Sequence, residues 1–337
     1  MKLRDYLTHR LILIIPTFLG ITLITFLVIQ LAPGDPAAMK LRLSADQAVM
    51  GDKVTQDIVE QTRKLYGLDK PIHIQYLIWL KRVVTFDFGN SFKDHRPVIE
   101  KIAERLPITI ELNLISIFLV YLIAIPIGVM SAVKQGTLGD RVVTVGLFIL
   151  YSLPNFWVAV LLIMFFGGGD FLNIFPIYGM ATPGIETAPL LSRLADHLWH
   201  LILPVFCLTY GGFAALSRYQ RASMLEVIRQ DYIRTARAKG LPEKLVIFKH
   251  AFRNSIIPIV TLLGYLLPGM FGGSVIIESI FSIPGMGQLG FEAVLSRDYP
   301  VVLAIATIAA LLTLFGLLVS DLLYVWADPR ISYEAEL

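Results

Sequence analysis

Long runs without charged residues dominate this chain of 337 residues. Only 16% of its residues are charged, whereas a typical soluble domain carries about 25%. The charges gather between the runs, and the mean hydropathy is +0.68. A helix needs about 20 consecutive apolar residues to cross the hydrocarbon core of a bilayer. The pattern therefore indicates an all-α integral membrane protein and excludes one large soluble core.

Six segments are long and apolar enough to be membrane spans. They run approximately over Leu11–Ala32, Ile108–Val133, Val142–Phe166, Leu198–Leu216, Ile256–Phe281 and Val301–Trp326. The first is about 22 residues long, more than the roughly 7 to 15 of a signal-peptide core, so we expect a retained helix.

The distribution of Lys and Arg among short loops predicts the orientation. With the N-terminus inside, the inner parts 1–10, 134–141, 218–255 and 328–337 carry three, two, nine and one basic residues. The short outer loops 167–197 and 282–300 carry one each. Long segments translocate largely regardless of charge. We therefore expect six spans with both termini in the cytoplasm.

These spans divide the chain into regions. Residues 1–32 form the cytoplasmic N-terminus and first span, 33–107 an external insert, 108–327 a five-span core with the inner loop 218–255, and 328–337 a cytoplasmic tail. In the insert, Thr55 is a candidate cap for a helix ending at Gly67, and Pro71 is a candidate start for a second helix. Residues 86–90 (FDFGN) read as a turn, so the insert should be small and mostly helical.

Acidic residues and glycines near the spans are candidates for a translocation path. Glu111 and Glu278 lie near outer ends of spans, and a charge in hydrocarbon usually faces a cavity or a partner. Simple exposure at the interface is an equal alternative. Gly269, Gly272 and Gly273 belong to the fifth expected span, where kinks would suit a path that opens and closes. Close helix packing is the competing explanation for these glycines.

No catalytic or metal-binding set stands out. His197 and His200 are spaced i, i+3, but two ligands do not make a metal site, so we read them as interfacial histidines. The single cysteine, Cys207, reads as a small buried hydrophobe. Residues 167–170 (GGGD) match the letters of an intramembrane aspartyl protease motif. That chemistry needs a second aspartate, typically in Tyr-Asp, and the chain contains no Tyr-Asp.

The inner loop from Arg218 to Asn254 carries nine Lys or Arg residues. Its apolar spacing through Ile233 and Ala236 predicts a short helix, and Gly240 is placed to end it. Such a helix can offer a surface to a partner protein or lie on anionic lipid. Periodicity leaves these two interpretations open.

The same loop carries a family resemblance. Arg234-Thr235-Ala236, followed by Gly240, resembles the EAA loop of ABC importer permeases, although Arg and Thr replace the Glu and first Ala of the generic motif. The surrounding DYIRTARAKGL and KHAFRNSIIPIV look like the peptide branch, which includes oligopeptide, dipeptide and nickel importers. So do LAPGDP, YGLDKPIHIQY, FDFGNSF, ESIFSIPGMGQLGFEAV, SRDYPVV and DPRI, in order along the whole chain. GGFAAL at 211–216 and FGGG at 166–169 resemble the subgroup that imports longer peptides and microcin C.

The resemblance implies a type I ABC importer permease of the bacterial inner membrane, a transport subunit and not an enzyme. Its substrates would be peptides brought by an extracytoplasmic binding protein, with nickel or another small solute as the alternative. Its partners would be a second permease subunit and two ATPase subunits, or one chain with two ATPase domains. The residues that couple to the ATPase would be Arg234, Thr235, Ala236, Arg237, Ala238, Lys239, Gly240 and Leu241.

The energy source is expected on another polypeptide. No lysine in the chain is followed by Ser or Thr, so the chain has no P-loop, and partner subunits would bind ATP and Mg²⁺. A secondary transporter, which would need no ATPase, is the remaining alternative. Such transporters often contain inverted repeats and midplane charge pairs, and neither is evident in the sequence.

Overall fold

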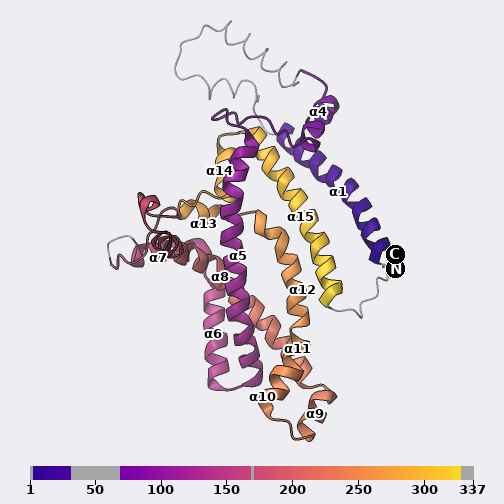
Figure 1. Cartoon of the computed structure of the whole chain (residues 1–337), viewed down its shortest axis with the longest axis vertical. Helices are drawn as coiled ribbons and strands as arrows, with labels where there is room; N and C mark the ends of the chain where they lie inside the picture. The colour runs from indigo at the N-terminus through magenta and orange to yellow at the C-terminus, as the bar shows by residue number, and fades with distance from the viewer. Residues whose placement is uncertain (1–2, 32–68, 168–170, 328–337) are drawn as a thin grey trace. The chain divides into compact units, whose positions relative to one another are not determined.

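The computed structural model describes residues 3–31, 69–167 and 171–327, which form helices joined by turns and loops (Figure 1). The predicted helix from Thr55 to Gly67 and the tail 328–337 lie outside these ranges. The longer helices are α1 (Leu3–Leu31), α4 (Ile72–Val84), α5 (Val98–Val133), α6 (Leu138–Ser152), α7 (Asn155–Phe166), α8 (Leu190–Ile228), α12 (Ile257–Leu266), α14 (Met286–Leu295) and α15 (Tyr299–Ala327). The shorter elements are a 3-10 turn (Ile185–Thr187), α9 (Asp231–Ala238), α10 (Glu243–Leu245), a π-helical stretch (Val246–Ala251), α11 (Phe252–Ser255), a second 3-10 turn (Leu267–Phe271) and α13 (Val275–Ile280).

Four of these helices are long and apolar enough to cross a bilayer. The qualifying stretches are Thr8–Val28, Val98–Val133, Leu190–Ile228 and Tyr299–Leu322. The helices α6 and α7 qualify only as a pair and bend by 97° between them. The predicted class, an all-α membrane protein, is confirmed, and the described residues give four spans, or five with the bent pair.

The bend between α6 and α7 falls at Leu153 and Pro154. Pro154 has no N–H to continue the helical hydrogen bonds. The hydroxyl of Tyr210, on α8, donates to the carbonyl of Leu153 at 2.8 Å. A side chain from a neighbouring helix thus satisfies a backbone group at the break, as apolar surroundings require.

The segment expected as the fifth span is also broken. Instead of one helix over Ile256–Phe281, the chain forms α12, a 3-10 turn and α13. Pro268 lies at the start of the 3-10 turn, and Gly273 has a φ of 66°, which disfavours other residues. The Asn113 side chain donates to the carbonyl of Met270 at 2.9 Å. The prolines and glycines of this segment therefore divide it into separate helical elements, whereas only kinks within one helix were expected.

The described chain divides into two compact units. Of the described residues, the first comprises 3–31, 69–108 and 285–315. Its core contains Val98, Ile102, Met286, Leu289, Ala293, Val301 and Ala304. Phe26 of α1 stacks on Trp79 of α4 with ring centroids 5.8 Å apart, and Thr22 lies 3.0 Å from the hydroxyl of Tyr76. The helix predicted to follow Pro71 is therefore confirmed as α4, packed on α1.

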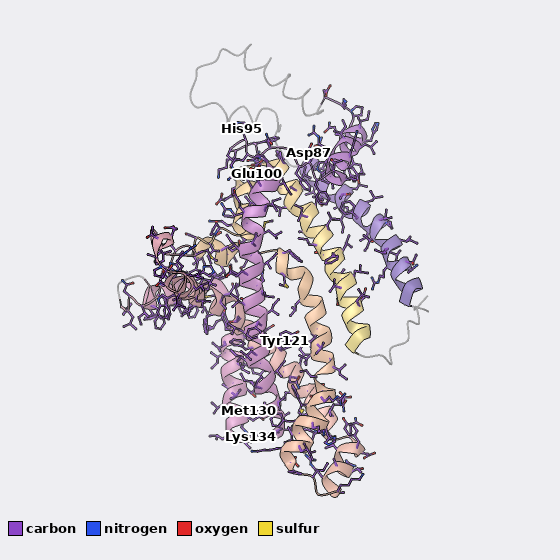
Figure 2. The ribbon with its side chains drawn as sticks, viewed as in Figure 1. Asp87, His95, Glu100, Tyr121, Met130 and Lys134 are labelled. Carbon is purple, nitrogen blue, oxygen red and sulfur yellow. The ribbon has the colours of Figure 1, made fainter. Side chains whose placement is uncertain are left out.

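The second unit comprises the described residues 109–167, 171–284 and 316–327. Close packing of α5 on α8 depends on Gly128, because a Cβ atom there would lie 2.6 Å from the carbonyl oxygen of Ser217. A Cβ on Gly212 would likewise lie 2.8 Å from a methyl group of Val120. Figure 2 labels Met130 near the last turn of α5 and Lys134 just after the helix. At these two sites, the absence of a side chain on glycine thus lets α5 and α8 pack closely together.

Candidate functional site

The helix α9 is held on the second unit by two side chains. Ile233 is fully buried and Ala236 is 6% exposed. They belong to a core cluster with Val129, Met224 and Val246 from the neighbouring elements. Val129 lies on α5 and Met224 on α8, so α9 packs against the C-terminal parts of two long helices. A short polar helix needs such packing, because an isolated helix of eight residues is not stable in water.

Gly240 ends α9, as predicted. Its φ is 77°, in the left-handed region that favours glycine. The N–H of Gly240 donates to the carbonyl of Arg237 at 2.9 Å. The N–H of Leu241 donates to the carbonyl of Ala236 at 3.4 Å. This pair of bonds is the Schellman pattern of helix ends. The direction in which the chain leaves α9 is therefore set by Gly240.

The eight predicted coupling residues separate into two groups. The side chain of Ala236 is buried, and Leu241 packs on the same core, so both stabilise the loop from inside. We call the others the coupling surface: Arg234, Thr235, Arg237, Ala238, Lys239 and Gly240, all of them exposed. Of the eight predicted residues, these six have exposed positions, whereas Ala236 is buried and Leu241 is partly buried.

One ion pair spans the end of the coupling surface. Arg237 donates to Glu243 through Nη2 at 2.7 Å and through Nε at 3.2 Å. These hydrogen bonds lower the pKa of the Glu243 carboxyl and raise the pKa of Arg237. Both side chains are about half exposed, so the pair contributes little to stability and mainly orients Arg237.

The loop is also attached at its far end. Gln220 Nε2 donates to Ser255 Oγ at 3.0 Å, and Ser223 Oγ donates to the Ser255 carbonyl at 2.8 Å. Asn254 donates to the hydroxyl of Tyr232, on α9, at 2.9 Å. These bonds tie α11 to α8 and to α9. The loop is therefore a packed structure and not a loose connection.

Of the predicted path residues, Glu278 is buried and hydrogen-bonded. It is 2% exposed and lies in the first turn of α13. Its carboxylate accepts from the N–H of Ser274 at 3.1 Å and from Thr109 Oγ1 at 3.3 Å. It thus stabilises the start of α13, immediately after Gly272 and Gly273. Gly269 and Gly272 are exposed and lie in the break that precedes α13.

Glu111 has a different setting, which the sequence did not reveal. Its side chain is 39% exposed and lies 2.7 Å from His197 Nε2. His197 Nδ1 lies 3.0 Å from the carbonyl oxygen of Met180, so the ring connects α5 with the loop before α8. His200, by contrast, contacts its own helix through the Asp196 carbonyl at 2.8 Å. Within the described part of the chain, no group of three or more His, Cys, Asp or Glu residues is placed to hold a metal ion.

Comparison with known proteins assigns the family. The family described as "Binding-protein-dependent transport system inner membrane component" matches residues 124–333, and the one described as "Binding-prot-dependent transport system membrane comp, N-term" matches residues 3–113. The chain is 42% identical to the oligopeptide transport system permease protein AppB of Bacillus subtilis (strain 168), over 97% of this chain and 99% of that one.

Two further relatives agree. The chain is 36% identical to the inner membrane ABC transporter permease protein YejB of Escherichia coli O157:H7, over 98% of this chain and 99% of the relative. It is also 36% identical to the dipeptide transport system permease protein DppB of Alkalihalophilus pseudofirmus, over 97% and 99%. The predicted resemblance to peptide ABC importer permeases is confirmed. The chain belongs to the family of binding-protein-dependent transport system inner membrane components.

Proposed function

We propose that this chain is the transmembrane permease subunit of an ATP-driven importer for peptides that an extracytoplasmic binding protein delivers. It works with a second, homologous permease subunit and with two ATPase subunits or one chain with two ATPase domains, which bind ATP and Mg²⁺. The family and the peptide-transport names of its relatives support this proposal, and they do not favour nickel as substrate. The chain resides in the bacterial inner membrane with both termini in the cytoplasm.

The observation that carries the mechanism is the geometry of α9. An exposed basic surface lies on a helix whose other face is buried, and whose end is set by Gly240. Force applied to such a surface moves the packed helices beneath it, because protein interiors are close-packed. The coupling surface therefore docks on the ATPase, and ATP-driven movement of the ATPase reaches α5 and α8 through Ile233 and Ala236.

The translocation path is proposed along the broken segment before α13. Non-helical backbone at membrane depth is tolerated where it is buried or lines a water-filled cavity. Gly269, Gly272 and Gly273 lie at this break, and Glu111 is partly exposed elsewhere in the same unit. Glu278 supports the break through its hydrogen bonds and is assigned a structural part in the path.

The test replaces Gly240 with Trp in the full transporter, reconstituted in proteoliposomes with its ATPase and binding protein. Gly240→Trp places a large side chain on the coupling surface and strains the left-handed backbone by about 1–2 kcal/mol. We expect peptide uptake to be lost while the protein still inserts and elutes as a folded species.

Gly184→Trp is the matched control. Gly184 also has a positive φ, 88°, with open space around its Cα, but it lies in the predicted outer loop. Its variant should keep uptake near the unmodified level. Normal uptake by Gly240→Trp, or equal loss in both variants, would show that the coupling surface does not transmit the motion.

A further inference from the structure

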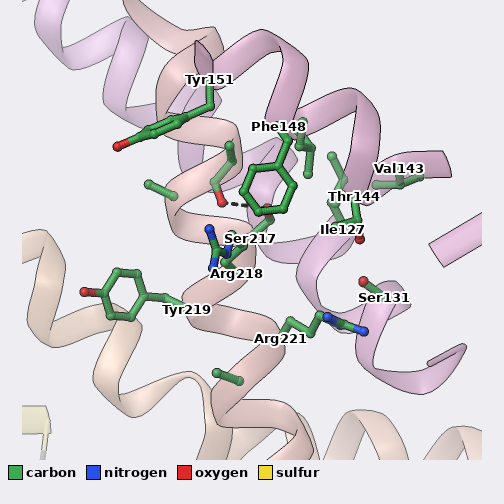
Figure 3. A pocket seen from close by; sticks show the side chains of 14 residues that line it. Ile127, Ser131, Val143, Thr144, Phe148, Tyr151, Ser217, Arg218, Tyr219 and Arg221 are labelled. Carbon is green, nitrogen blue, oxygen red and sulfur yellow. Dashed lines mark hydrogen bonds between the residues drawn. The ribbon is translucent and has the colours of Figure 1, made fainter. Parts of the chain in front are cut away.

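A pocket of about 540 Å³ lies between α5, α6 and α8 in the second unit (Figure 3). Its volume is within the roughly 300–1,000 Å³ of typical ligand sites. Apolar side chains such as Leu147 and Phe148 form one wall, and the small residues Ala214 and Ala215 leave space on the α8 side. The proposed coupling and path residues lie outside this lining, so the pocket needs its own explanation.

Two arginines from α8 enter the lining. The guanidinium carbon of Arg218 lies 4.8 Å from the centre of the Phe148 ring, a cation–π arrangement that holds the cation at the pocket wall (Figure 3). Arg221 donates to Asp140 through Nη2 at 2.9 Å. Its Nε is buried without a hydrogen-bond partner within the described chain. One N–H of this guanidinium is thus buried without an acceptor among the described residues.

The pocket carries an excess of positive charge. Asp140 pairs with Arg221, and its carboxylate also accepts from Ser131 Oγ and from the N–H of Gly136 at 2.9 Å. Its negative charge is therefore shared among several donors. Two guanidinium groups against one such carboxylate leave a net positive site, and guanidinium matches the geometry of phosphate oxygens.

The position of the charges along the helices identifies the occupant. Arg218 and Arg221 follow the apolar stretch of α8 directly, whereas Phe148 and Tyr151 lie farther along α6 from its polar start. The neighbouring α6 side chains Val142 and Ile149 are 64% and 58% exposed, as on a surface that faces lipid. The pocket therefore has charged residues at one end and apolar residues along its wall. A ligand with a phosphate at one end and an apolar chain would contact both parts, whereas a free anion would leave the apolar wall in water.

We propose that this pocket binds an anionic phospholipid of the cytoplasmic leaflet, with its phosphate on Arg218 and Arg221 and an acyl chain along Phe148. Basic pockets between spans on the cytoplasmic side are a known setting for anionic headgroups. The site goes beyond the transport function proposed above, and only the assignment to the cytoplasmic leaflet rests on the proposed orientation.

The test is native mass spectrometry of the full-length chain in detergent, titrated with phosphatidylglycerol and with phosphatidylcholine of the same acyl chains. The unmodified chain should bind phosphatidylglycerol more tightly. Arg218→Gln should weaken that binding about fivefold, the effect of one basic residue near an anionic lipid, and should weaken phosphatidylcholine binding less, because the choline cation offsets the charge of its phosphate. Arg218→Lys should retain most of the preference.

Arg141→Gln is the matched control, since it removes the same charge from the first turn of α6 outside the pocket lining. It should bind both lipids as the unmodified chain does. Phe148→Ala is a second variant, expected to weaken both lipids, and it keeps the test informative if Arg218→Gln does not fold. Size-exclusion elution of each variant checks the fold.

Several outcomes would overturn the proposal: equal affinity of the unmodified chain for the two lipids, equal weakening by Arg141→Gln, or displacement of the lipid by millimolar inorganic phosphate. The last would identify a site for small anions. The measurement contains neither ATPase nor binding protein, so it can fail while Gly240→Trp still uncouples transport, and the two proposals are tested separately.

Discussion

Asp298 and Ser91 lie 207 positions apart in the chain and are joined by a buried hydrogen bond from the serine hydroxyl to the carboxylate. The other carboxylate oxygen of Asp298 accepts from the N–H of Phe92 at 2.9 Å. Lys101 donates to Ser91 Oγ at 3.2 Å and to Asp94 at 2.7 Å. Two of the family-like segments, FDFGNSF and SRDYPVV, are therefore attached to each other in the first unit.

Loss of the Asp298 carboxylate should destabilise this unit. Asp298→Ala leaves the Ser91 hydroxyl and the Phe92 N–H without their acceptor, and each buried unpaired group costs about 1–3 kcal/mol. We expect a lower thermal unfolding midpoint in detergent. Glu292→Ala is the control, because its pair with Lys93 is exposed at 3.5 Å and contributes less than about 1 kcal/mol. Equal shifts for both variants would contradict a special contribution from Asp298.

Adding one methyl group should discriminate between two helical glycines. Gly128→Ala forces a Cβ atom against the Ser217 carbonyl and the Gln220 side chain, and overpacking of this kind costs about 1–3 kcal/mol. Gly146→Ala meets no atom within 4 Å, so it should be neutral or slightly stabilising. Thermal unfolding of the two variants checks the difference, and a tolerant Gly128→Ala would mean that α5 and α8 are not closely packed there.

The two acidic path candidates should behave differently. Glu278→Ala removes a buried acceptor from Ser274 and Thr109, so we expect a lower unfolding midpoint and poor yield. Glu111→Gln changes a partly exposed site, so it should alter the free energy of unfolding by no more than about 0.5 kcal/mol. It should nevertheless lower the rate of peptide uptake. Uptake at the unmodified rate by Glu111→Gln would remove Glu111 from the proposed path.

The pair formed by Arg237 and Glu243 should depend on pH in one direction. Folding lowers the pKa of Glu243 from its ordinary value of 4.5. Its contribution is therefore complete above pH 4.5 and is lost as the pH falls through the lowered pKa. Glu243→Gln should reduce the free energy of unfolding slightly at pH 7, by less than about 1 kcal/mol, and this difference should shrink as the pH falls below 4.5 through the lowered pKa.

A double variant isolates this pair. If charge pairing is the cause, adding Arg237→Gln to Glu243→Gln should have little further effect on the midpoint at pH 7. A difference between Glu243→Gln and the unmodified chain that does not shrink as the pH falls below 4.5 would point instead to a packing effect at the end of α9.

Hydropathy predicts where apolar helices occur, but it contains no information on direction. The run from Val142 to Phe166 is predicted as one span because it is mostly apolar and contains no charged residue, yet the chain bends by 97° near Pro154. The run Ile256–Phe281 is also predicted as one span, yet its helix is interrupted at Pro268 and Gly273. The helix end at Gly240 was predictable because a local signal, glycine after an apolar repeat, specifies it.

Long-range pairs were not predictable from one sequence. Glu111 and His197 are 86 residues apart, and Ser91 and Asp298 more than twice that. Neither pattern nor composition links the members of such pairs. Which of the predicted coupling residues are buried was partly predictable from the sequence, because the helical spacing of Ile233 and Ala236 places both on one face. That Leu241 packs inward depends on the turn at Gly240.

The length of α8 has a mechanical consequence. Its 39 residues extend over about 58 Å, roughly twice the hydrocarbon thickness of a bilayer. The apolar part and the polar end beside α9 thus belong to one rod, with no loop between them. A tilt of about 5° would displace a point 30 Å along such a rod by roughly 3 Å. A small movement of the loop would therefore tilt α8 and displace the helices that α8 contacts.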